Sequence, residues 1–258
     1  MSFKFVDFEE AQKQSGLRMV VVTRLPSPWG EAAKGILKIK KIDWTAVPLD
    51  QGNDEMAAWT GQRRGPVAMY NDEQPRGGWA EILLLAERLS PEPALIPASA
   101  SDRSLMFGLA HEVCGEMGLG WMRRLSCIHA GLTGGIGFPE GVAHYLAPRY
   151  GYRAEEAEGF TQRIVEILRL LSDRLHAQAQ NPSDSPFYVG GQVSAMDVYS
   201  ATFMALFKPL PPEYCPMPDA LRLAFETLDD STAKALDPIL IEHRDRMYQD
   251  YLELPLTL

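Results

Sequence analysis

Ser27 is the residue of this chain best placed to act on a bound ligand. It stands in the stretch Ser27-Pro28-Trp29, between a predicted strand at residues 19–23 and a predicted helix at residues 31–41. The first turn of a helix presents free backbone amides and a partial positive charge, which together stabilise an anion. A thiolate held there has a lowered pKa and a larger reactive fraction at neutral pH. The sequence therefore indicates a helix start at Ser27 that could stabilise an anion such as a thiolate, although a serine before a helix also often serves only as its cap.

Arginines in the same third of the chain add a second kind of chemistry. Arg63, Arg64 and Arg76 lie in predicted loops. A guanidinium group binds a carboxylate through two parallel hydrogen bonds. These arginines either recognise a carboxylate of the ligand or are ordinary surface residues, and the sequence leaves both interpretations open.

Other reactive residue types give no recognisable site. The five histidines show no metal-ligand spacing, so no metal site is expected. Three cysteines without C-x-x-C spacing, Cys114, Cys127 and Cys215, favour reduced thiols over disulfides or a zinc site. The glycine-rich stretch at residues 131–137 lacks the Gly-Lys-Ser/Thr ending of a phosphate loop and is expected to be a helix break.

Strand and helix patterns alternate over the first third of the chain. Residues 19–23 form a continuous apolar, β-branched run typical of a buried strand. Further strands are expected at residues 44–49 and 66–70, and helices at residues 31–41, 54–60 and 79–89. A fourth strand near Gln74 is poorly marked. This order predicts a thioredoxin-like α/β domain over residues 18–89, preceded by an N-terminal extension, residues 1–17, to which the sequence assigns no role.

A proline-rich stretch without periodicity, residues 90–100, is expected to be a linker. Beyond it strand patterns disappear, and residues 101–258 are predicted to form an all-helical domain. The expected helices cover residues 104–127, 139–146, 154–179, 194–207, 218–226 and 236–251.

The start of one of these helices carries a strong local signature. Ser194 and Asp197 have the S-x-x-D spacing of a capping box, in which the Ser194 hydroxyl accepts from the Asp197 amide and the Asp197 carboxylate accepts from the Ser194 amide. Val193 and Val198 flank the cap as a hydrophobic staple. The helix that follows is mostly apolar, so the cap is expected to lie inside the fold.

These features together resemble the cytosolic glutathione S-transferase superfamily over residues 18–250. The resemblance implies a thioredoxin-like domain followed by a helical domain, a homodimer, and transfer of the glutathione thiolate to a small hydrophobic electrophile in a cytoplasmic detoxification reaction. Ser27 would donate a hydrogen bond to the glutathione sulfur and would not itself attack. Gly65-Pro66 matches the family's cis-proline, whose preceding residue pairs with the cysteinyl part of glutathione; Gly65 stands where valine is more usual. Trp29 and Arg64 would also contact glutathione, while Met106, Phe107 and Trp121 would wall the electrophile site or belong to the core.

Gly77-Gly78 is where the chain departs from the family pattern. Members usually carry Glu-Ser or Asp-Ser there to hold the γ-glutamyl end of glutathione. Backbone amides of Gly77, Gly78 and Trp79 still offer an anion site at the helix start, but nothing in the motif pairs the ligand's ammonium group. A second hypothesis is therefore a non-catalytic protein of the same fold that binds a small ligand or a protein.

Composition excludes several other classes of protein. The chain has 258 residues, 46% hydrophobic and 23% charged, as expected for an ordered globular protein. Its 34 acidic and 25 basic residues give a net charge of −9, which argues against nucleic-acid binding. It contains no long uncharged apolar run, and the acidic residues near its start do not fit a signal peptide, so a cytoplasmic location without membrane contact is expected.

Overall fold

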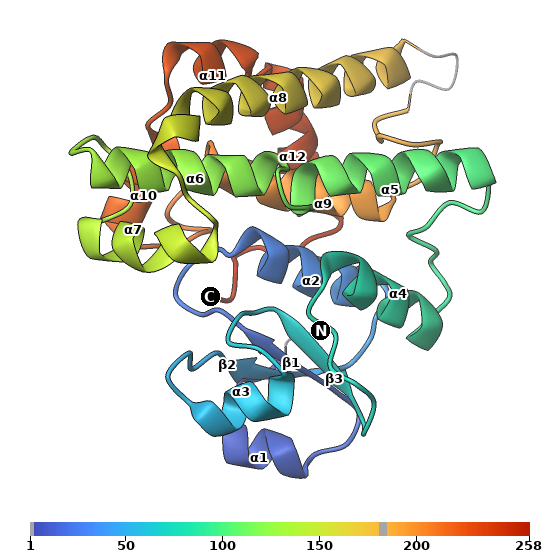
Figure 1. Ribbon diagram of the computed structural model, residues 1–258. Helices are drawn as coiled ribbons and strands as arrows, with labels where there is room; N and C mark the ends of the chain where they lie inside the picture. Colours follow the sequence, from blue (N-terminus) through green and yellow to red (C-terminus); the bar gives the residue numbers. More distant parts are fainter. Residues whose placement is uncertain (1–2, 181–184) are drawn as a thin grey trace.

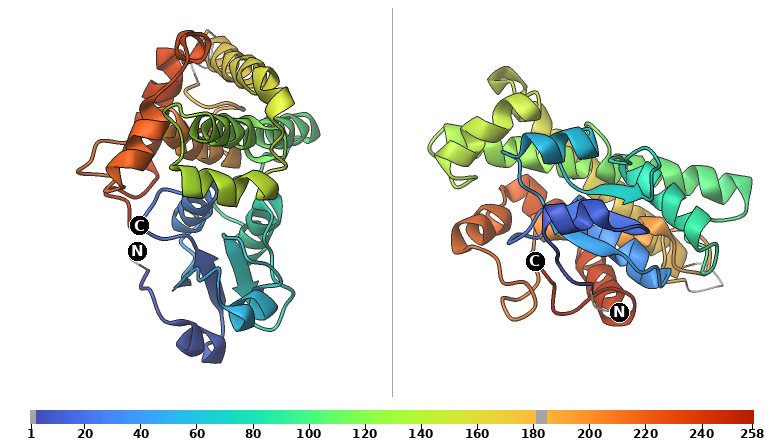
Figure 2. Two further views of the ribbon diagram at one scale, coloured as in Figure 1. Left: turned by 60° about the vertical axis from the view of Figure 1, so that its left-hand side comes forward. Right: turned by 90° about the horizontal axis from the view of Figure 1, so that it is seen from below.

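The computed structural model describes residues 3–180 and 185–258. A small sheet with its helices forms one part of the molecule, and a larger group of helices lies above it in Figure 1. Two further views show the same separation into a sheet domain and a helical domain (Figure 2). The predicted class, an α/β domain followed by an all-α domain, is confirmed.

The sheet has the strand order β2-β1-β3, with β1 (Leu17–Val21) in the centre. β2 (Thr45–Pro48) runs parallel to β1, and β3 (Val67–Tyr70) runs antiparallel to it. Met19 lies opposite Ala46 on one side and Ala68 on the other. The crossover from β1 through a helix to the parallel β2 is the β-α-β unit that the sequence predicted.

Two details of the sheet differ from the prediction. β1 begins at Leu17 rather than at residue 19, and it includes the buried Arg18, whose two Nη atoms donate to the Gln14 and Asn71 carbonyls. The expected fourth strand near Gln74 is only a bridge, in which Ala68 and Arg76 exchange two 2.9 Å backbone hydrogen bonds. Pro75 offers no amide, and a helix starts at Trp79, so little chain remains there for pairing.

Residues 3–17 are part of the sheet domain rather than a separate extension. Phe5 forms a parallel bridge with Ala46 at the edge of β2. Helix α1 (Phe8–Lys13) follows, capped by the Asp7 side chain, which accepts from the Glu10 amide. Phe8 and Ala11 are buried in a small core that includes Val20. This segment therefore helps to cover the second face of the sheet.

Helices cover both faces of the sheet (Figure 1). α1 and α3 (Asp54–Thr60) lie on the outer face, while α2 (Pro28–Ile39) and α4 (Trp79–Leu89) lie between the sheet and the helical domain. Ile36 of α2 and Ile82 of α4 belong to the large core that continues into the helical domain. The two domains thus share one apolar interior.

After residues 90–99, which form bends and turns, the chain is helical. The helices of the second domain are α5 (Ala100–Cys114), α6 (Leu119–Leu132), α7 (Glu140–Leu146), α8 (Ala157–Ala179), α9 (Ala195–Phe203), α10 (Asp219–Glu226), α11 (Asp230–Ala235) and α12 (Pro238–Asp250), with short 3₁₀ turns at Ala147–Arg149, Ala154–Glu156 and Met204–Leu206. α11 was not predicted. None of the described helices combines the length and apolar character needed to cross a membrane.

The helix expected over residues 104–127 is two helices, α5 and α6. The break lies at residues 115–118, where Met117 has a positive φ of 62°. A Cβ at Gly118 would lie 2.7 Å from the Glu112 carbonyl oxygen, so the glycine allows the chain to fold against the end of α5. The interruption opens a place on the helical domain where a side chain of α2 docks.

Asp197 at the start of α9 is the most heavily hydrogen-bonded carboxylate of the core. Its Oδ2 accepts from the Ser194 amide at 2.8 Å and from the Ser194 hydroxyl at 2.7 Å. Its Oδ1 accepts from the Tyr188 amide at 2.9 Å and from His243 Nε2 at 3.1 Å. The hydroxyl thus donates to the carboxylate instead of accepting from the Asp197 amide, which bonds the Ser194 carbonyl at 3.1 Å. A fully buried carboxylate requires donors, and the hydroxyl supplies one.

Asp197→Asn tests this arrangement. The amide group places a donor where the carboxylate accepts from Ser194 or His243, and it leaves buried polar groups poorly paired. We expect the free energy of unfolding, measured by urea denaturation, to fall by about 3 kcal/mol or more. Asp245→Asn is the control, because Asp245 pairs with Arg244 from an exposed position and its loss is expected to cost under about 1 kcal/mol. Equal losses in the two variants would contradict the role given to Asp197.

Candidate functional site

Ser27 is the N-cap residue of α2 and lies at the boundary between the sheet and the helical domain. It is 4% exposed, and its hydroxyl does not cap the helix. Within the described part of the chain no group hydrogen-bonds this hydroxyl. Pro28 occupies the first turn, where a missing amide costs nothing. The arrangement leaves a hydroxyl and the positive end of a helix dipole together, which suits an anion.

The loop before β3 packs against the strand that leads to Ser27. The Gly65–Pro66 peptide bond is cis, as the resemblance implied. A Cβ at Gly65 would lie 3.2 Å from the Val20 carbonyl oxygen and 3.5 Å from the Val22 amide nitrogen. The glycine therefore lets this loop approach the end of β1 closely. The cis-proline loop and the segment that leads to Ser27 therefore lie at the same end of the sheet, where β1 ends.

Gln62 and Glu81 occupy the region of Gly77-Gly78. A Cβ on Gly77 would lie 2.3 Å from Gln62 Nε2, and that same nitrogen donates to the Arg64 carbonyl at 3.2 Å. The Glu81 carboxylate accepts from the Gly78 amide at 3.0 Å. The amide expected to be free for a ligand is therefore already bonded. The sequence gave no indication that Gln62 would lie beside Gly77. The contact of Glu81 with the Gly78 amide could have been predicted, because the spacing Gly78-x-x-Glu81 matches the carboxylate half of a capping box.

Trp29 joins α2 to the helical domain. Its indole nitrogen donates to the Cys114 carbonyl at 2.9 Å, at the break between α5 and α6. Its ring meets Phe203 of α9 edge to face at a centroid distance of 4.8 Å. The structure thus places Trp29 in the domain interface, and this position gives the residue a structural task besides the ligand contact expected of it.

Arg124 of α6 contacts the Trp29 ring from the helical domain. Its guanidinium carbon lies 4.9 Å from the centroid of the Trp29 ring and 5.5 Å from that of Tyr150. Arg124 Nη1 donates to the Tyr150 hydroxyl at 2.7 Å. The Trp121 ring is tilted against the Tyr150 ring at a centroid distance of 4.6 Å. Trp121, which was expected to wall the electrophile site, therefore belongs to the same cluster.

Helix α7 brings the helical domain down to the loop after β2 (Figures 1 and 2). The Tyr145 hydroxyl donates to the side-chain oxygen of Gln51 in that loop. Arg63 in turn donates to the Gln51 carbonyl at 3.0 Å and pairs with Asp54. Arg149, which precedes Tyr150, donates to the Tyr145 carbonyl at 2.7 Å. Contacts and chain neighbours therefore lead from the start of α2 through Arg124, Tyr150, Arg149, Tyr145 and Gln51 to the cis-proline loop and the end of β1; we call this path the contact ring.

The remaining predicted site residues lie in different surroundings. Met106 is fully buried in the core, while Phe107 is partly exposed and lies 6.3 Å from the Trp79 ring. Arg64 is exposed. Arg76 pairs with Glu73, which also pairs with Arg88, and hydrogen bonds from these two arginines lower the pKa of Glu73.

The cysteines are buried and unpaired. Burial raises the pKa of Cys114, Cys127 and Cys215, so their thiols are protonated at neutral pH and unsuited to nucleophilic attack. Within the described residues no group of three or more histidine, cysteine or carboxylate side chains could hold a metal ion.

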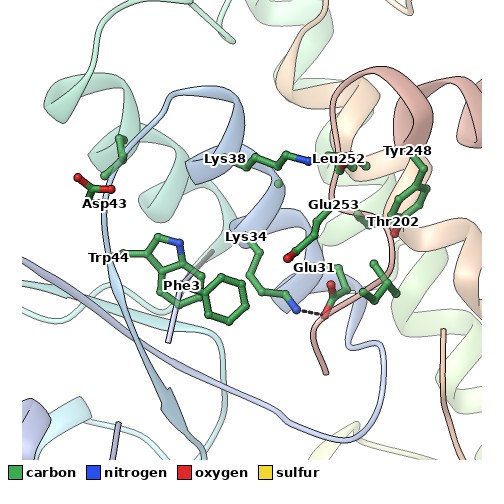
Figure 3. Close-up of a pocket in the computed structure, with 13 residues that line it drawn as sticks. Phe3, Glu31, Lys34, Lys38, Asp43, Trp44, Thr202, Tyr248, Leu252 and Glu253 are labelled. Atoms are coloured by element: carbon green, nitrogen blue, oxygen red, sulfur yellow. Dashed lines mark hydrogen bonds and ion pairs between the residues drawn. The ribbon is translucent and has the colours of Figure 1, made fainter. Parts of the chain in front are cut away.

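The most clearly formed cavity lies on a different face of α2, about 90 Å³ in volume (Figure 3). It is enclosed by α2, the N-terminal segment and the C-terminal segment after α12. Lys34 donates to the Thr257 carbonyl at 2.8 Å, and Lys38 donates to the Leu252 carbonyl at 2.5 Å. These bonds hold the C-terminal segment against the outside of α2, so the cavity is part of the domain junction.

Glu31 forms the floor of this junction with Lys34. Their ion pair is 2.6 Å long, and each side chain is 7% exposed. Burial raises the pKa of Glu31 from 4.5 to about 7 despite the neighbouring Lys34 ammonium, and the Glu253 carboxylate adds to the shift. A carboxylate in the first turn of α2 therefore titrates near neutral pH.

Comparison with solved structures establishes the architecture. A glutathione S-transferase from Methylobacillus flagellatus with glutathione bound matches with a TM-score of 0.62 and 16% identity, covering 91% of this chain and 95% of the other. A glutathione transferase family member from Pseudomonas fluorescens with two glutathione molecules bound matches with a TM-score of 0.61 and 12% identity, covering 93% and 92%. One from Xanthobacter autotrophicus matches with a TM-score of 0.60 and 14% identity, covering 94% and 98%.

The chain has the glutathione S-transferase fold. No family model and no curated protein matches its sequence.

Glu31→Gln tests the titration of the buried pair. Because the folded-state pKa of Glu31 exceeds its unfolded value, the folded form binds this proton more tightly, and stability is lost as pH rises from about 4.5 to about 7. We expect the Glu31 contribution to the free energy of unfolding to fall by up to about 3 kcal/mol across this window, and Glu31→Gln to remove that dependence. Urea denaturation at several pH values measures it. Glu158→Gln, at an exposed position on α8, is the control, and a Glu31→Gln profile as steep as that of the unchanged protein would refute the assignment.

Proposed function

We propose that this protein is a glutathione S-transferase-like enzyme that activates a thiol at the start of α2 and transfers it to a small hydrophobic electrophile. The observation that carries the proposal is the Ser27 hydroxyl, which has no partner among the described residues and stands at the positive end of α2. The cis Gly65–Pro66 loop supports it, because the Gly65 backbone has no hydrogen bond to the described residues and can pair with the ligand. Stabilising the thiolate and holding it beside the electrophile together supply the rate.

The groups at this site have separate tasks. The Ser27 hydroxyl donates to the thiolate, and the amides of the first turn of α2 add their dipole. Gly65 offers its backbone to the cysteinyl part of the thiol. Trp121 and Phe107 are partly exposed and supply apolar contact for the electrophile, whereas Met106 supports them from the core.

A second candidate function is supported by Gln62. Its side chain fills the space beside Gly77, and Glu81 already bonds the Gly78 amide. A ligand with a γ-glutamyl arm has to displace the Gln62 side chain or share the Gly78 amide with Glu81. On this view the protein binds a small ligand or a protein partner through the same fold and does not turn over glutathione.

We also propose a homodimer, by analogy with the family. Leu84 on α4 and Leu105 on α5 are exposed apolar side chains available for such an interface.

Ser27→Ala tests the enzymatic proposal. Removing the donor to the thiolate is expected to lower kcat/KM for glutathione with a chloronitrobenzene electrophile about ten- to a hundredfold, and to raise the apparent pKa of the pH–rate profile. Ser104→Ala on α5, whose hydroxyl only bonds the Ala100 carbonyl, is the matched control. Absence of heat on titrating the unchanged protein with millimolar glutathione would reject glutathione as the thiol. Unchanged turnover in Ser27→Ala would remove the role of this residue.

Restoring the family's acidic-serine pair tests the second candidate function. The variant Gln62→Ala/Gly77→Glu/Gly78→Ser clears the space beside Gly77 and supplies a carboxylate and a hydroxyl for the γ-glutamyl group. We expect calorimetry to show glutathione affinity increased about tenfold or more. The pair Gly77→Glu/Gly78→Ser without the Gln62 change is the control and should gain less, because Gln62 still competes for the space. No gain in either variant would mean that glutathione does not place its γ-glutamyl arm here.

A further inference from the structure

The contact ring around Ser27 is basic in an acidic protein. Its segments carry five arginines, Arg24, Arg63, Arg64, Arg124 and Arg149, and three acids, Glu31, Asp50 and Asp54. The whole chain has a net charge of −9. Among the described residues, Arg63 alone of these five pairs with a carboxylate, that of Asp54. An excess of positive charge is therefore concentrated where the ligand would enter.

Arg124 is the most deeply placed of these cations, and most of its donors are unused. A guanidinium has five N–H donors, and the described residues provide one hydrogen-bond acceptor, the Tyr150 hydroxyl. Its Nε is buried without a partner. The remaining neighbours are the faces of Trp29 and Tyr150, which attract a cation but accept no conventional hydrogen bond.

Other arginines of the helical domain show how the same group is satisfied elsewhere. Arg123, the preceding residue, donates to the carbonyls of Leu206, Ala224, Phe225 and Thr227. Arg163 pairs with Glu112 at 2.5 Å. Arg124 has neither a set of carbonyls nor a carboxylate in the described chain. Since an unpaired guanidinium donor is costly to bury, an external anion is the partner its geometry suits.

The surroundings of Arg124 also fix the shape of that anion. Trp29 and Tyr150 are partly exposed rings that contact the guanidinium, and the partly exposed Trp121 ring lies against Tyr150. Flat aromatic side chains favour a flat aromatic ligand, with ring centroids about 4.5–7 Å apart. Trp29 lies two residues after Ser27 in the first turn of α2, so these rings belong to the part of the helical domain that adjoins the start of α2.

We propose that Arg124 binds the carboxylate of an aromatic carboxylate substrate, so that the preferred electrophile of this protein is a small aromatic compound that carries a carboxylate. This substrate class rests on the transferase activity proposed above. In the reaction, the thiolate forms a carbon–sulfur bond at the ring carbon that carries a leaving group, such as chloride, and chloride departs with the bonding electrons of the carbon–chlorine bond. Arg124 takes no part in bond breaking; it positions the ring.

Matched electrophiles test the proposal. The unchanged protein, Arg124→Gln and Arg124→Lys are assayed with glutathione and para-chloro-meta-nitrobenzoate or its neutral carboxamide, each rate being corrected for the uncatalysed reaction. Arg124→Gln is expected to lower kcat/KM for the benzoate about tenfold or more while changing that for the carboxamide less than about threefold. The loss should appear mainly in KM, with partial recovery in Arg124→Lys. Arg169→Gln, an exposed arginine on α8, is the control and should change neither.

Binding separates failure of this proposal from failure of the transferase activity. Calorimetric titration with unreactive meta-nitrobenzoate and meta-nitrobenzamide needs no turnover. Tighter binding of the benzoate, abolished by Arg124→Gln, would support the anion site even if no variant conjugates either electrophile, in which case the transferase proposal alone falls. Equal binding of the two compounds, or equal losses of activity for both electrophiles in Arg124→Gln, would overturn the role of Arg124.

Discussion

The buried Asp197 carboxylate is the point on which the domain arrangement depends. Four donors converge on its two oxygens, from Ser194, Tyr188 and His243. They tie the loop before α9 and helix α12 to the start of α9. Because Phe203 at the end of α9 meets Trp29 of α2, this internal bonding also sets the surface against which α2 docks. The start of α2 is therefore held by groups far from it in the sequence.

Local spacing made much of this predictable. Ser194-x-x-Asp197 marks a helix start whatever surrounds it, and the run of apolar residues in the centre of the sheet, near Met19, identifies a buried strand. The Ser194-x-x-Asp197 spacing could not show which group donates and which accepts in each hydrogen bond of the cap. The Ser194 hydroxyl donates to the carboxylate because the side chain is fully buried, and burial is decided by the packing of α12 and its His243.

The residues of the candidate site could be predicted where a short sequence motif contains them. Ser27 before α2 and the proline after Gly65 could be read directly, and Gly77-Gly78 could be read as a departure from the family. Gln62 could not, since it reaches Gly77 only through the fold of the loop between them. No sequence pattern pointed to Arg124 either. Its part in the proposal depends on hydrogen-bond acceptors that the described residues do not provide around it, and a sequence shows only which residues adjoin it along the chain.

The Glu31 carboxylate on one face of α2 must not neutralise the positive helix dipole at the start of α2, which stabilises an anion there. A carboxylate in the first turn of a helix opposes the binding of an anion at its start, and Glu31 is such a carboxylate, bonded through its amide to the Ser27 carbonyl at 2.8 Å. Lys34 lies 2.6 Å from it, so the ionised pair is neutral as a whole, and protonation of Glu31 would leave the positive charge of Lys34 about two turns from Ser27. The Glu31–Lys34 pair is therefore neutral or positive in both protonation states. Glu31 in this pair adds no net negative charge to the start of α2, where the proposed anion would bind.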